Sequence, residues 1–275
     1  MRLIGFLFDG EGWIGAVREQ RLWPIAPIDA FYTDPTAVLA QASTSSEATL
    51  DGMSVTHVPA VPRSAKVVCV GLNYRSHAAE AGMDVPTYPT VFGRWASTLV
   101  VDGAELWVPA GEAGLDWEVE LAVVIGRTLH EADAATALDA VLGYTVFNDV
   151  SARRKQMQTS QWTLGKNGDR TGPIGPVVVT PDELPDPCNL QLELRVNGTV
   201  MQSANTKDMV FTVPEILAYV TDTVTLEPGD VVATGTPDGV GFTRSPAVLL
   251  GPGDVVEAAV EGIGTLRNAV GHRPE

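Results

Sequence analysis

The chain contains 275 residues, of which 45% are hydrophobic and 19% charged, a composition typical of a soluble globular protein. Its 18 Lys and Arg residues against 34 Asp and Glu residues give a formal net charge of −16. A surface this acidic repels phosphate backbones and anionic lipids, which argues against nucleic-acid and membrane partners. The two cysteines, Cys69 and Cys188, are too few for a disulfide framework or a four-thiolate zinc site.

The first residues do not resemble a targeting segment. Their six-residue apolar run is interrupted by Gly5 and followed by acidic residues. A secretory signal peptide needs a longer apolar run and a small-residue cleavage site. No window of the sequence approaches 18 uninterrupted apolar residues, the length needed to span a bilayer. We therefore expect a cytoplasmic protein.

Residues 1–60 predict a small N-terminal domain. Short alternating apolar runs indicate strands at 3–8 and 13–17. The stretch 34–50 is rich in Ala, Ser and Thr and indicates a helix. Two closely spaced prolines before residue 63 predict a hinge, because proline fixes φ and drives the preceding residue to extended geometry.

Residues 61–275 predict a larger, β-rich domain. Turn signals such as Asn-Gly and Pro-Gly-Asp separate short apolar segments, which indicate strands at 66–70, 104–108, 118–125, 141–148, 175–180, 190–196, 231–234 and 255–260. Helices are expected at 133–140 and 213–220, the second with a proline in its first turn. Many short strands with few helices indicate an α+β fold rather than a doubly wound sheet.

Two glutamates, Glu118 and Glu120, lead into the apolar segment that begins at Leu121. Side chains two residues apart on a strand point to the same face, so we expect these carboxylates to lie side by side. They repel each other unless a cation or a shared proton lies between them. The ordinary interpretation of such a pair is a solvated edge strand, but the adjoining sequence is strongly apolar.

Asp149, at the end of another apolar segment, supplies a third carboxylate. Ligation by oxygen alone selects a hard cation, here Mg²⁺ with Mn²⁺ or Ca²⁺ as alternatives, rather than zinc. Three carboxylates leave coordination positions open for a chelating substrate. The three acids therefore predict a metal site that also binds substrate.

His77 and Glu80 lie three residues apart, directly after the strand expected at 66–70. On one helical turn they share a face and can form a hydrogen bond. A carboxylate that orients an imidazole is the simplest general-base pair, because it fixes the tautomer and raises the proton affinity. The competing interpretation is an incidental pair on a surface helix, but His77 alone of the four histidines lies at a strand-to-helix turn among polar neighbours.

Two glycine-rich segments have the character of substrate clamps. Lys166 precedes the sequence Gly-Pro-Ile-Gly-Pro at 172–176, which predicts a rigid turn near the strand ends. The sequence Thr-Gly-Thr-Pro-Asp-Gly-Val-Gly at 234–241 follows a strand, and its glycines permit close approach of a ligand. Such loops most often form only turns. The segment lacks the lysine of a nucleotide P-loop, so we do not interpret it as a phosphate site.

Seven ordered motifs between residues 66 and 270 resemble those of the fumarylacetoacetate hydrolase family. They are GLNYRSHAAEAG, DWEVELAVVIG, YTVFNDVSAR, QWTLGKNGDRTGPIGP, VNGTVMQSANTKDMVF, LEPGDVVATGTPDGVG and LGPGDVVEAAVEGIGTLRN. Each motif alone is weak, whereas the ordered set is specific. The resemblance implies a β-roll catalytic domain with a small N-terminal domain and a homodimer. It also implies a divalent metal, usually Mg²⁺, and substrates that are 2-oxo or 2,4-dioxo acids.

The resemblance places the metal ligands at Glu118, Glu120 and Asp149. It places the general-base pair at His77 and Glu80, in a segment that in relatives often orders as a lid over the bound ligand.

Further positions match the substrate contacts of the family. Arg153, Lys166 and Thr236 match residues that hold the carboxylate and oxo groups of the substrate. Gln156 matches a position that helps to orient water or the His–Glu pair.

The implied reaction is hydrolysis of the C3–C4 bond of an acylpyruvate to pyruvate and a carboxylic acid. The metal and Lys166 stabilise the pyruvate enolate, and the His77–Glu80 pair deprotonates a water that attacks the C4 carbonyl. The same enolate stabilisation serves decarboxylation of oxaloacetate or isomerisation of a dienoate, so both stay as alternatives. A catalytically silent metal-binding dimer is a third hypothesis, which the complete set of polar residues disfavours.

The sequence departs from the family pattern at three places near the expected site, one of which is Arg154-Lys155, where relatives frequently carry an acid. Arg94 stands where relatives carry the lysine of a Phe-x-Lys sequence, which predicts altered substrate contacts because guanidinium is a planar fork and not a point charge. Asn167 and Gly168 stand where relatives often carry Ser-Phe, and the loss of that aromatic ring predicts a more open pocket wall.

Overall fold

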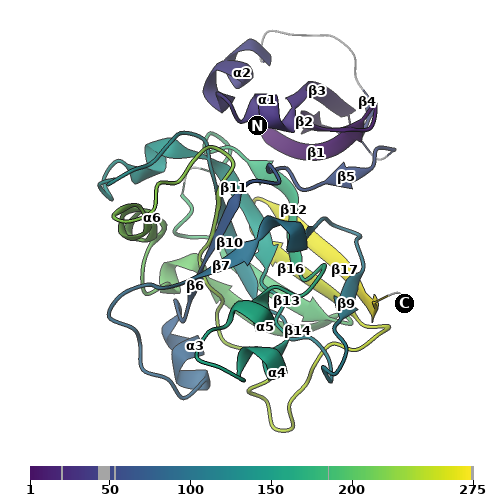
Figure 1. The fold of residues 1–275 in the computed structure, drawn as a ribbon, viewed down its shortest axis with the longest axis vertical. Coiled ribbons are helices and arrows are strands. Elements are labelled where there is room, and N and C mark those ends of the chain that lie inside the picture. The colour runs from purple at the N-terminus through teal and green to yellow at the C-terminus, as the bar shows by residue number, and fades with distance from the viewer. Residues whose placement is uncertain (20, 43–49, 53, 185, 274–275) are drawn as a thin grey trace.

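The computed structural model describes residues 1–275 except 20, 43–49, 53, 185 and 274–275, and within that range it consists mainly of two β-sheets (Figure 1). The larger, 12-stranded sheet has the spatial order β4 (Leu50–Asp51), β3 (Arg21–Pro27), β2 (Glu11–Arg18), β1 (Arg2–Phe8), β12 (Gly172–Val179), β11 (Val141–Asn148), β10 (Val119–Ile125), β15 (Val231–Ala233), β6 (Lys66–Gly71) and β7 (Thr90–Trp95). Beside this path, β5 (His57–Val58) pairs with β1, and β8 (Leu99–Val100) pairs with β12.

The smaller sheet is five-stranded in the described part of the chain. Its spatial order is β14 (Thr199–Asn205), β13 (Gln191–Val196), β16 (Val255–Val260), β17 (Gly264–His272) and β9 (Leu106–Val108). Short helices connect the strands: α1 (Ile28–Phe31), α2 (Pro35–Ala42), α3 (Arg75–Glu80), α4 (Arg153–Gln156), α5 (Thr163–Lys166) and α6 (Val213–Thr221). No helix among the described residues is both long and apolar enough to cross a membrane.

Strand β10 is buried on both faces, which explains its nearly unbroken apolar sequence. On one face, Leu121 and Val123 belong to a core cluster that includes residues of β13 and β16 from the smaller sheet. On the other face, Ala122 and Val124 belong to a second cluster, shared with the N-terminal segment. Because strand side chains alternate, Glu120 continues the row of Ala122 and Val124.

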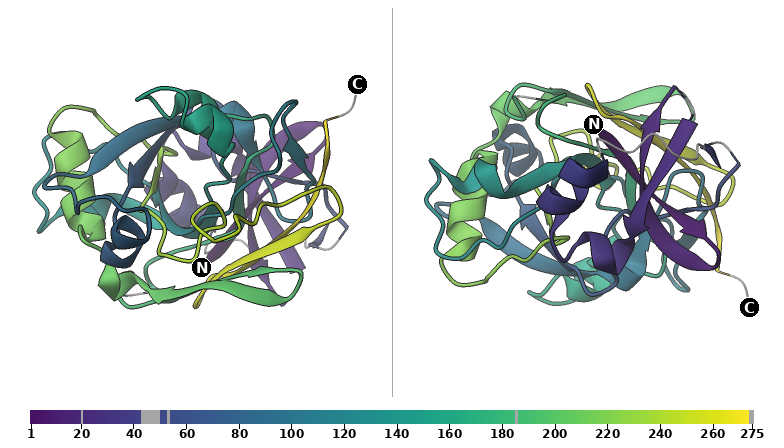
Figure 2. Two further views of the ribbon diagram at one scale, coloured as in Figure 1. Left: turned by 90° about the horizontal axis from the view of Figure 1, so that it is seen from below. Right: turned by 90° about the horizontal axis from the view of Figure 1, so that it is seen from above.

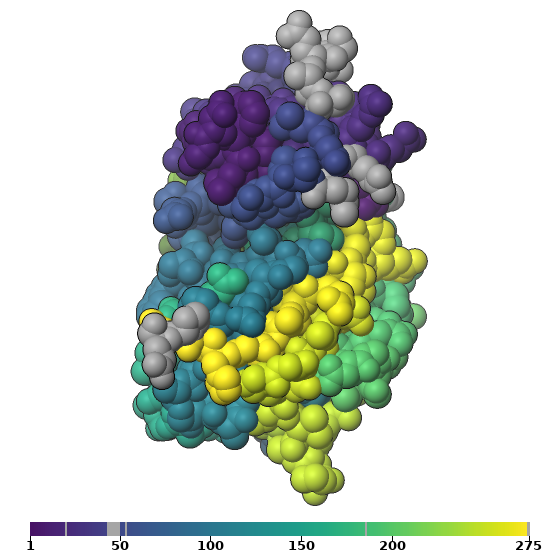
Figure 3. Space-filling model, turned by 90° about the vertical axis from the view of Figure 1, so that its right-hand side faces the viewer, coloured from purple at the N-terminus to yellow at the C-terminus, as the bar shows by residue number. Residues whose placement is uncertain are grey.

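Residues 1–60 cover one end of the body, as the views from above and from the side show (Figures 2 and 3). Strand β1 extends the larger sheet by pairing antiparallel with β12, with Leu3 opposite Val178. Leu3, Ile14 and Phe31 share their core cluster with Phe147 of β11. The N-terminal segment is therefore joined to the body by both backbone pairing and apolar packing, and the domain boundary at residue 60 stays a prediction.

The β-rich α+β fold expected from the sequence is confirmed, and the segment 213–220 forms α6 as predicted. The helix expected at 133–140 is wrong, since only a 3₁₀ turn, η2 (Ala137–Ala140), forms there. The Asp133 side chain accepts the backbone N–H of Ala135, a local bond that competes with helix formation.

The helix expected at 34–50 is shorter in the structure. It comprises α2, and Leu50 already belongs to a strand, while 43–49 lie outside the described residues. Seven strands were not expected from the sequence pattern: β3, β4, β5, β7, β8, β14 and β17.

Candidate metal and substrate site

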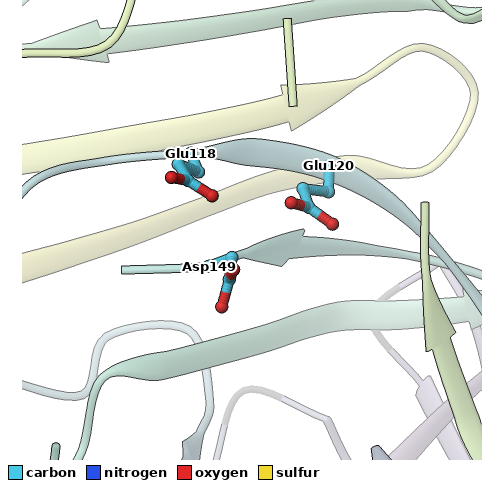
Figure 4. Close-up of side chains that lie close together, drawn as sticks. All are labelled: Glu118, Glu120 and Asp149. Atoms are coloured by element: carbon cyan, nitrogen blue, oxygen red, sulfur yellow. The ribbon is translucent and has the colours of Figure 1, made fainter. Parts of the chain in front are cut away.

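Three carboxylates converge where β10 begins and β11 ends, and Figure 4 shows Glu118 and Glu120 pointing from one segment towards the segment that carries Asp149. One oxygen from each side chain lies within 4.8 Å of the others. The antiparallel pairing brings them together, because Asp149 follows β11 and its backbone N–H donates to the carbonyl of Glu118 at 2.9 Å. Glu118 and Glu120 lie side by side, as the spacing of two predicts.

All three carboxylates are buried, with 5% of Glu118, 1% of Glu120 and none of Asp149 exposed. Buried charges require compensation by opposite charges or hydrogen bonds. Lys166, at the end of α5, supplies part of it: its Nζ lies 2.7 Å from Oε2 of Glu118 and 2.5 Å from Oδ2 of Asp149. The lysine that the family resemblance singles out thus bridges two of the three acids.

Two arginines complete the buried charge network. Arg153, at the start of α4, donates to Oδ2 of Asp116 at 2.8 Å and to Oε1 of Glu118 at 2.6 Å. Arg94, on β7, donates to Oδ1 of Asp149 at 2.7 Å and to the carbonyl of Val150 at 2.6 Å. The planar fork of Arg94 is therefore used to hold a carboxylate and the backbone behind it.

The electrostatic environment shifts the pKa values of Glu118 and Glu120 in opposite directions. Burial raises the pKa of Glu118, but the charges of Lys166 and Arg153 outweigh burial and lower the pKa to about 2. Burial and the neighbouring charges of Asp149 and Glu118 raise the pKa of Glu120 well above its usual value. Within the described residues, no lysine or arginine nitrogen forms an ion pair with Glu120, which accepts the backbone N–H of Gly235 at 2.9 Å.

The donor set fits a hard divalent cation. Its oxygens come from carboxylates alone, the ligand chemistry that Mg²⁺, Mn²⁺ and Ca²⁺ prefer. Four buried acids (Asp116, Glu118, Glu120 and Asp149) face three buried cations, so the network carries excess negative charge when Glu120 is ionised. A divalent cation at the three carboxylates would compensate that excess.

His77 and Glu80 share α3, as predicted, and Nδ1 of His77 lies 3.5 Å from Oε2 of Glu80. Burial opposes ionisation of Glu80, but hydrogen bonds with His77, Thr243 and Gly239 outweigh burial and lower its pKa. The backbone N–H of Gly239 lies 3.1 Å from both Glu80 carboxylate oxygens. Glu80 is therefore an ionised carboxylate, fixed by the loop after β15 and directed at the imidazole.

The loop after β15 also contacts Glu120 of the acidic triad, which consists of Glu118, Glu120 and Asp149. Gly235 has φ +97°, and a Cβ there would lie 2.7 Å from Cβ of Asn73 and 2.9 Å from the carbonyl of Val70. Only glycine permits this approach, which brings the Gly235 N–H to Glu120. The hydroxyl of Thr236, the next residue, accepts a hydrogen bond from Nε2 of Gln202 at 2.9 Å.

A cavity of about 140 Å³ connects these groups. Seven of the predicted site residues line it: His77, Glu118, Glu120, Arg153, Gln156, Lys166 and Thr236. The other two stand directly behind the wall, since Glu80 contacts His77 and Asp149 contacts Lys166. The structure therefore brings all nine predicted residues to one place.

Asp116 is a member of the network that the sequence interpretation missed. It is fully buried and accepts hydrogen bonds from the backbone N–H groups of Gly241 and Phe242 at 2.7 and 3.1 Å, besides the ion pair with Arg153. It thus ties the 239–242 loop to the arginine. The signal was available, because Asp116 opens the same acidic motif as the two glutamates.

Two earlier expectations concerned residues that do not line the cavity. Arg94 contacts Asp149 and the backbone of Val150, and it is not among the lining residues. Asn167 accepts the N–H of Trp95 at 2.7 Å and donates to the carbonyl of Thr163 at 2.8 Å, so it braces α5 against β7. Arg94 and Asn167 therefore contact residues around the cavity and do not line the cavity themselves.

A larger cavity, of about 520 Å³, lies between the N-terminal segment and the body, lined by residues such as Leu7, Ile28, Pro59 and Leu99. It contains none of the buried acids or cations of the network. Size alone does not mark the functional site, whereas the convergence of buried charges does.

The comparisons with known proteins agree with this geometry. Residues 66–271 match the family model described as fumarylacetoacetate (FAA) hydrolase C-terminal. A Burkholderia multivorans protein whose name proposes a hydrolase is 50% identical over 206 residues, which make up 74% of this chain and 73% of that protein.

Two solved structures share the whole fold. Fumarylacetoacetate hydrolase from Exiguobacterium antarcticum is 34% identical, with a TM-score of 0.83 over 99% of this chain and 100% of that chain. The 2-hydroxyhepta-2,4-diene-1,7-dioate isomerase from Mycobacterium marinum is 32% identical, with a TM-score of 0.80 over 100% of both chains. Because the family model covers most of the sequence and includes the acidic triad, the chain belongs to the fumarylacetoacetate hydrolase family.

Proposed function

We propose that this protein is a metal-dependent hydrolase that cleaves the C3–C4 bond of an acylpyruvate or a related 2,4-dioxo acid, giving pyruvate and a carboxylic acid. One observation carries the proposal: His77, oriented by an ionised Glu80, lines the same cavity as Glu118 and Glu120 of the acidic triad. A water-activating group and a cation-binding group therefore face one substrate-sized space.

Glu118, Glu120 and Asp149 would hold the cation, and we propose Mg²⁺ because every donor is a carboxylate oxygen. When bound, the cation supplies positive charge that favours the chelating head of a 2-oxo acid and the negative charge that develops on it.

Lys166 and Arg153 contribute positive charge from the chain itself. Both are buried cations on the cavity wall, and the surrounding acids outweigh burial and raise the pKa of each group. They stabilise the substrate carboxylate and the charge that develops on the 2-oxo oxygen as the C3–C4 bond breaks. Gln156 and Thr236 supply neutral polar contacts on the same wall.

The His77–Glu80 pair activates water. Because Nδ1 of His77 faces Glu80, the opposite nitrogen, Nε2, is left to accept a proton from water. The resulting hydroxide attacks the C4 carbonyl, the C3–C4 bond breaks, and C3 of the departing pyruvate takes up a proton. The ionised Glu80 stabilises the imidazolium that forms in between.

A second candidate activity is isomerisation of a hydroxy-dienedioate or decarboxylation of an oxaloacetate-type acid. The likeness to the Mycobacterium marinum isomerase supports isomerisation. These reactions need the same charge stabilisation and no attacking water. The oriented His77–Glu80 pair favours hydrolysis.

A steady-state assay tests the proposal. Acetylpyruvate, fumarylpyruvate and oxaloacetate are supplied with Mg²⁺, with and without a chelator, while loss of enol absorbance and release of pyruvate are followed. We expect chelator-sensitive cleavage of an acylpyruvate in preference to oxaloacetate. Preference for oxaloacetate, or turnover that is unaffected by the chelator, would contradict the proposal.

A further inference from the structure

We infer that the cavity selects a 2-oxo acid whose distal arm is uncharged and apolar, a short alkyl chain or a single ring, and not a second carboxylate. This inference rests on the proposed function, because it assumes that the head of the substrate binds at the triad. It concerns the remaining wall of the cavity, which consists largely of the apolar residues Met83, Phe92, Met157, Trp162 and Phe242.

Two of these side chains form a fixed aromatic wall. The rings of Phe92 and Trp162 meet edge to face, with centroids 5.4 Å apart and an interplanar angle of 74°. The indole lies against Gly71, where a Cβ would be only 2.5 Å from Cζ3 of Trp162. Because Gly71 has no side chain, the indole of Trp162 fits against it. The aromatic wall is therefore positioned by the last residue of β6.

The wall adjoins the charged end of the cavity. Nζ of Lys166 lies 5.3 Å from the centre of the Phe92 ring, and the Arg153 guanidinium lies 4.2 Å from the centre of the Phe242 ring. Each buried cation thus has carboxylates on one side and an aromatic face on the other. A substrate whose head reaches the cations extends its arm along aromatic rings.

The cavity offers no free cation for a second carboxylate. Among the described lining residues, Lys166 and Arg153 are the lysine and the arginine present, and both already bind buried acids. A carboxylate at the end of the arm would lose its hydration without gaining a partner, which is costly. An apolar arm would instead gain from burial against the aromatic wall.

The size and the mouth of the cavity limit the arm. Its volume of about 140 Å³ is close to that of a cavity of about 150 Å³ that admits benzene, and it has to hold the head of the substrate as well as the arm, so a longer arm would reach beyond the opening. Met83 and Met157 are 49% and 68% exposed, so they border the opening to solvent. Methionine side chains adapt to apolar groups of different shape, which suits a variable arm.

Binding of 2-oxo acids that share the same head tests this inference without relying on turnover. We propose titration calorimetry of the Mg²⁺-supplemented protein with 2-oxo-4-phenylbutanoate and with 2-oxoadipate. We expect the phenyl compound to bind at least about tenfold more tightly. Equal or tighter binding of 2-oxoadipate would overturn the inference while leaving the proposed function intact. Absence of Mg²⁺-dependent binding of both acids would instead refute the proposed function, and the inference with it.

Two variants test whether this wall of the cavity causes the selectivity. Trp162→Ala is expected to weaken binding of the phenyl compound several-fold and to leave 2-oxoadipate affinity unchanged. Met157→Lys adds a cation at the exposed rim, where the fold tolerates it, and is expected to tighten 2-oxoadipate binding several-fold. Leu164→Ala and Leu164→Lys are the matched controls, because Leu164 is 65% exposed and does not line the cavity. If Met157→Lys and Leu164→Lys tighten 2-oxoadipate binding equally, the assignment of the substrate arm to this cavity is contradicted.

Discussion

Glu120 belongs to β10, a central strand of the larger sheet, and Glu118 directly precedes that strand, whereas His77 and Glu80 belong to a helix of six residues at the margin of the sheet. The acidic triad is nearly inaccessible, and three buried cations hold two of its members, Glu118 and Asp149. Glu80 is only partly buried, and Gly239 fixes it through one backbone N–H. Both groups nevertheless reach one cavity.

This contrast separates two tasks. The core of the protein fixes the residues that we propose bind the cation and the substrate head, so their positions follow from the fold. The residues that we propose activate water, His77 and Glu80, depend on a short helix without a side-chain N-cap. We therefore expect substitutions in the two groups to affect binding, catalysis and stability in different combinations.

The largest effect is expected from Glu120→Gln. The variant removes one ligand charge, so we expect Mg²⁺ affinity to fall by about 100-fold or more and cleavage to be lost. No ion pair breaks among the described residues, and the raised pKa of Glu120 shows that its charge is unfavourable there. The metal-free variant should therefore be at least as stable as the wild type. Calorimetric titration with Mg²⁺ tests the expected loss of affinity, and urea denaturation tests the expected stability. Unchanged Mg²⁺ affinity would show that Glu120 is not a metal ligand.

Glu118→Gln tests the same contrast in stability, because Glu118, unlike Glu120, forms ion pairs with Lys166 and Arg153. Its loss removes one of the two carboxylates that Lys166 and Arg153 each bind, and breaking a buried ion pair costs about 3 to 5 kcal/mol. We expect a clear fall in the free energy of unfolding, measured with urea in the presence of a chelator. Equal stabilities of the variants at 118 and 120 would show that the ion pairs are not what separates the two glutamates.

His77→Ala should affect turnover alone. Loss of the general base is expected to lower kcat by about 10²- to 10⁴-fold, while Mg²⁺ affinity stays within about twofold of the wild type. Kinetics and a metal titration on one preparation test this. Unchanged turnover would eliminate the His77–Glu80 mechanism, and a parallel loss of metal affinity would show that the two groups are not separable.

The smallest effect concerns helix caps and pH. Unlike α3, helix α6 begins with a capping box in which the Thr212 hydroxyl and N–H donate to Glu215 and lower its pKa. A lowered folded-state pKa stabilises the protein above the unfolded-state value, and this contribution is lost as the pH falls through the folded-state value. Glu215→Gln should therefore cost a few tenths of a kcal/mol to about 1 kcal/mol at pH 7 and almost nothing near pH 3. Urea denaturation at both pH values checks this, with a pH-independent difference as the contrary result.

The sequence was sufficient for the acidic triad because a local rule applies there. Alternation on a strand places Glu118 beside Glu120, and an apolar context makes their burial unusual. It was likewise sufficient for most strands of the body, whose apolar runs end at turn signals. The helix expected at 133–140 failed because one short aspartate side chain outcompetes a weak local preference.

The remaining features depend on contacts between distant segments. Lys166 and Glu118 are 48 residues apart, and Arg94 and Asp149 are 55 apart, so their pairing follows from strand register and not from any local pattern. The place of Trp162 against Gly71 is equally invisible in the sequence. A resemblance can name a residue such as Lys166, but the structure is needed to show which acids it binds.

The pairing of β1 with β12 has a practical consequence for fragments of this protein. Removing residues 1–60 would expose the edge of β12 and the apolar residues now covered by Leu3, Ile14 and Phe31. An unpaired strand edge beside an apolar face is a template for aggregation. We expect residues 61–275 expressed alone to elute as aggregates in gel filtration, even though they contain every residue of the site.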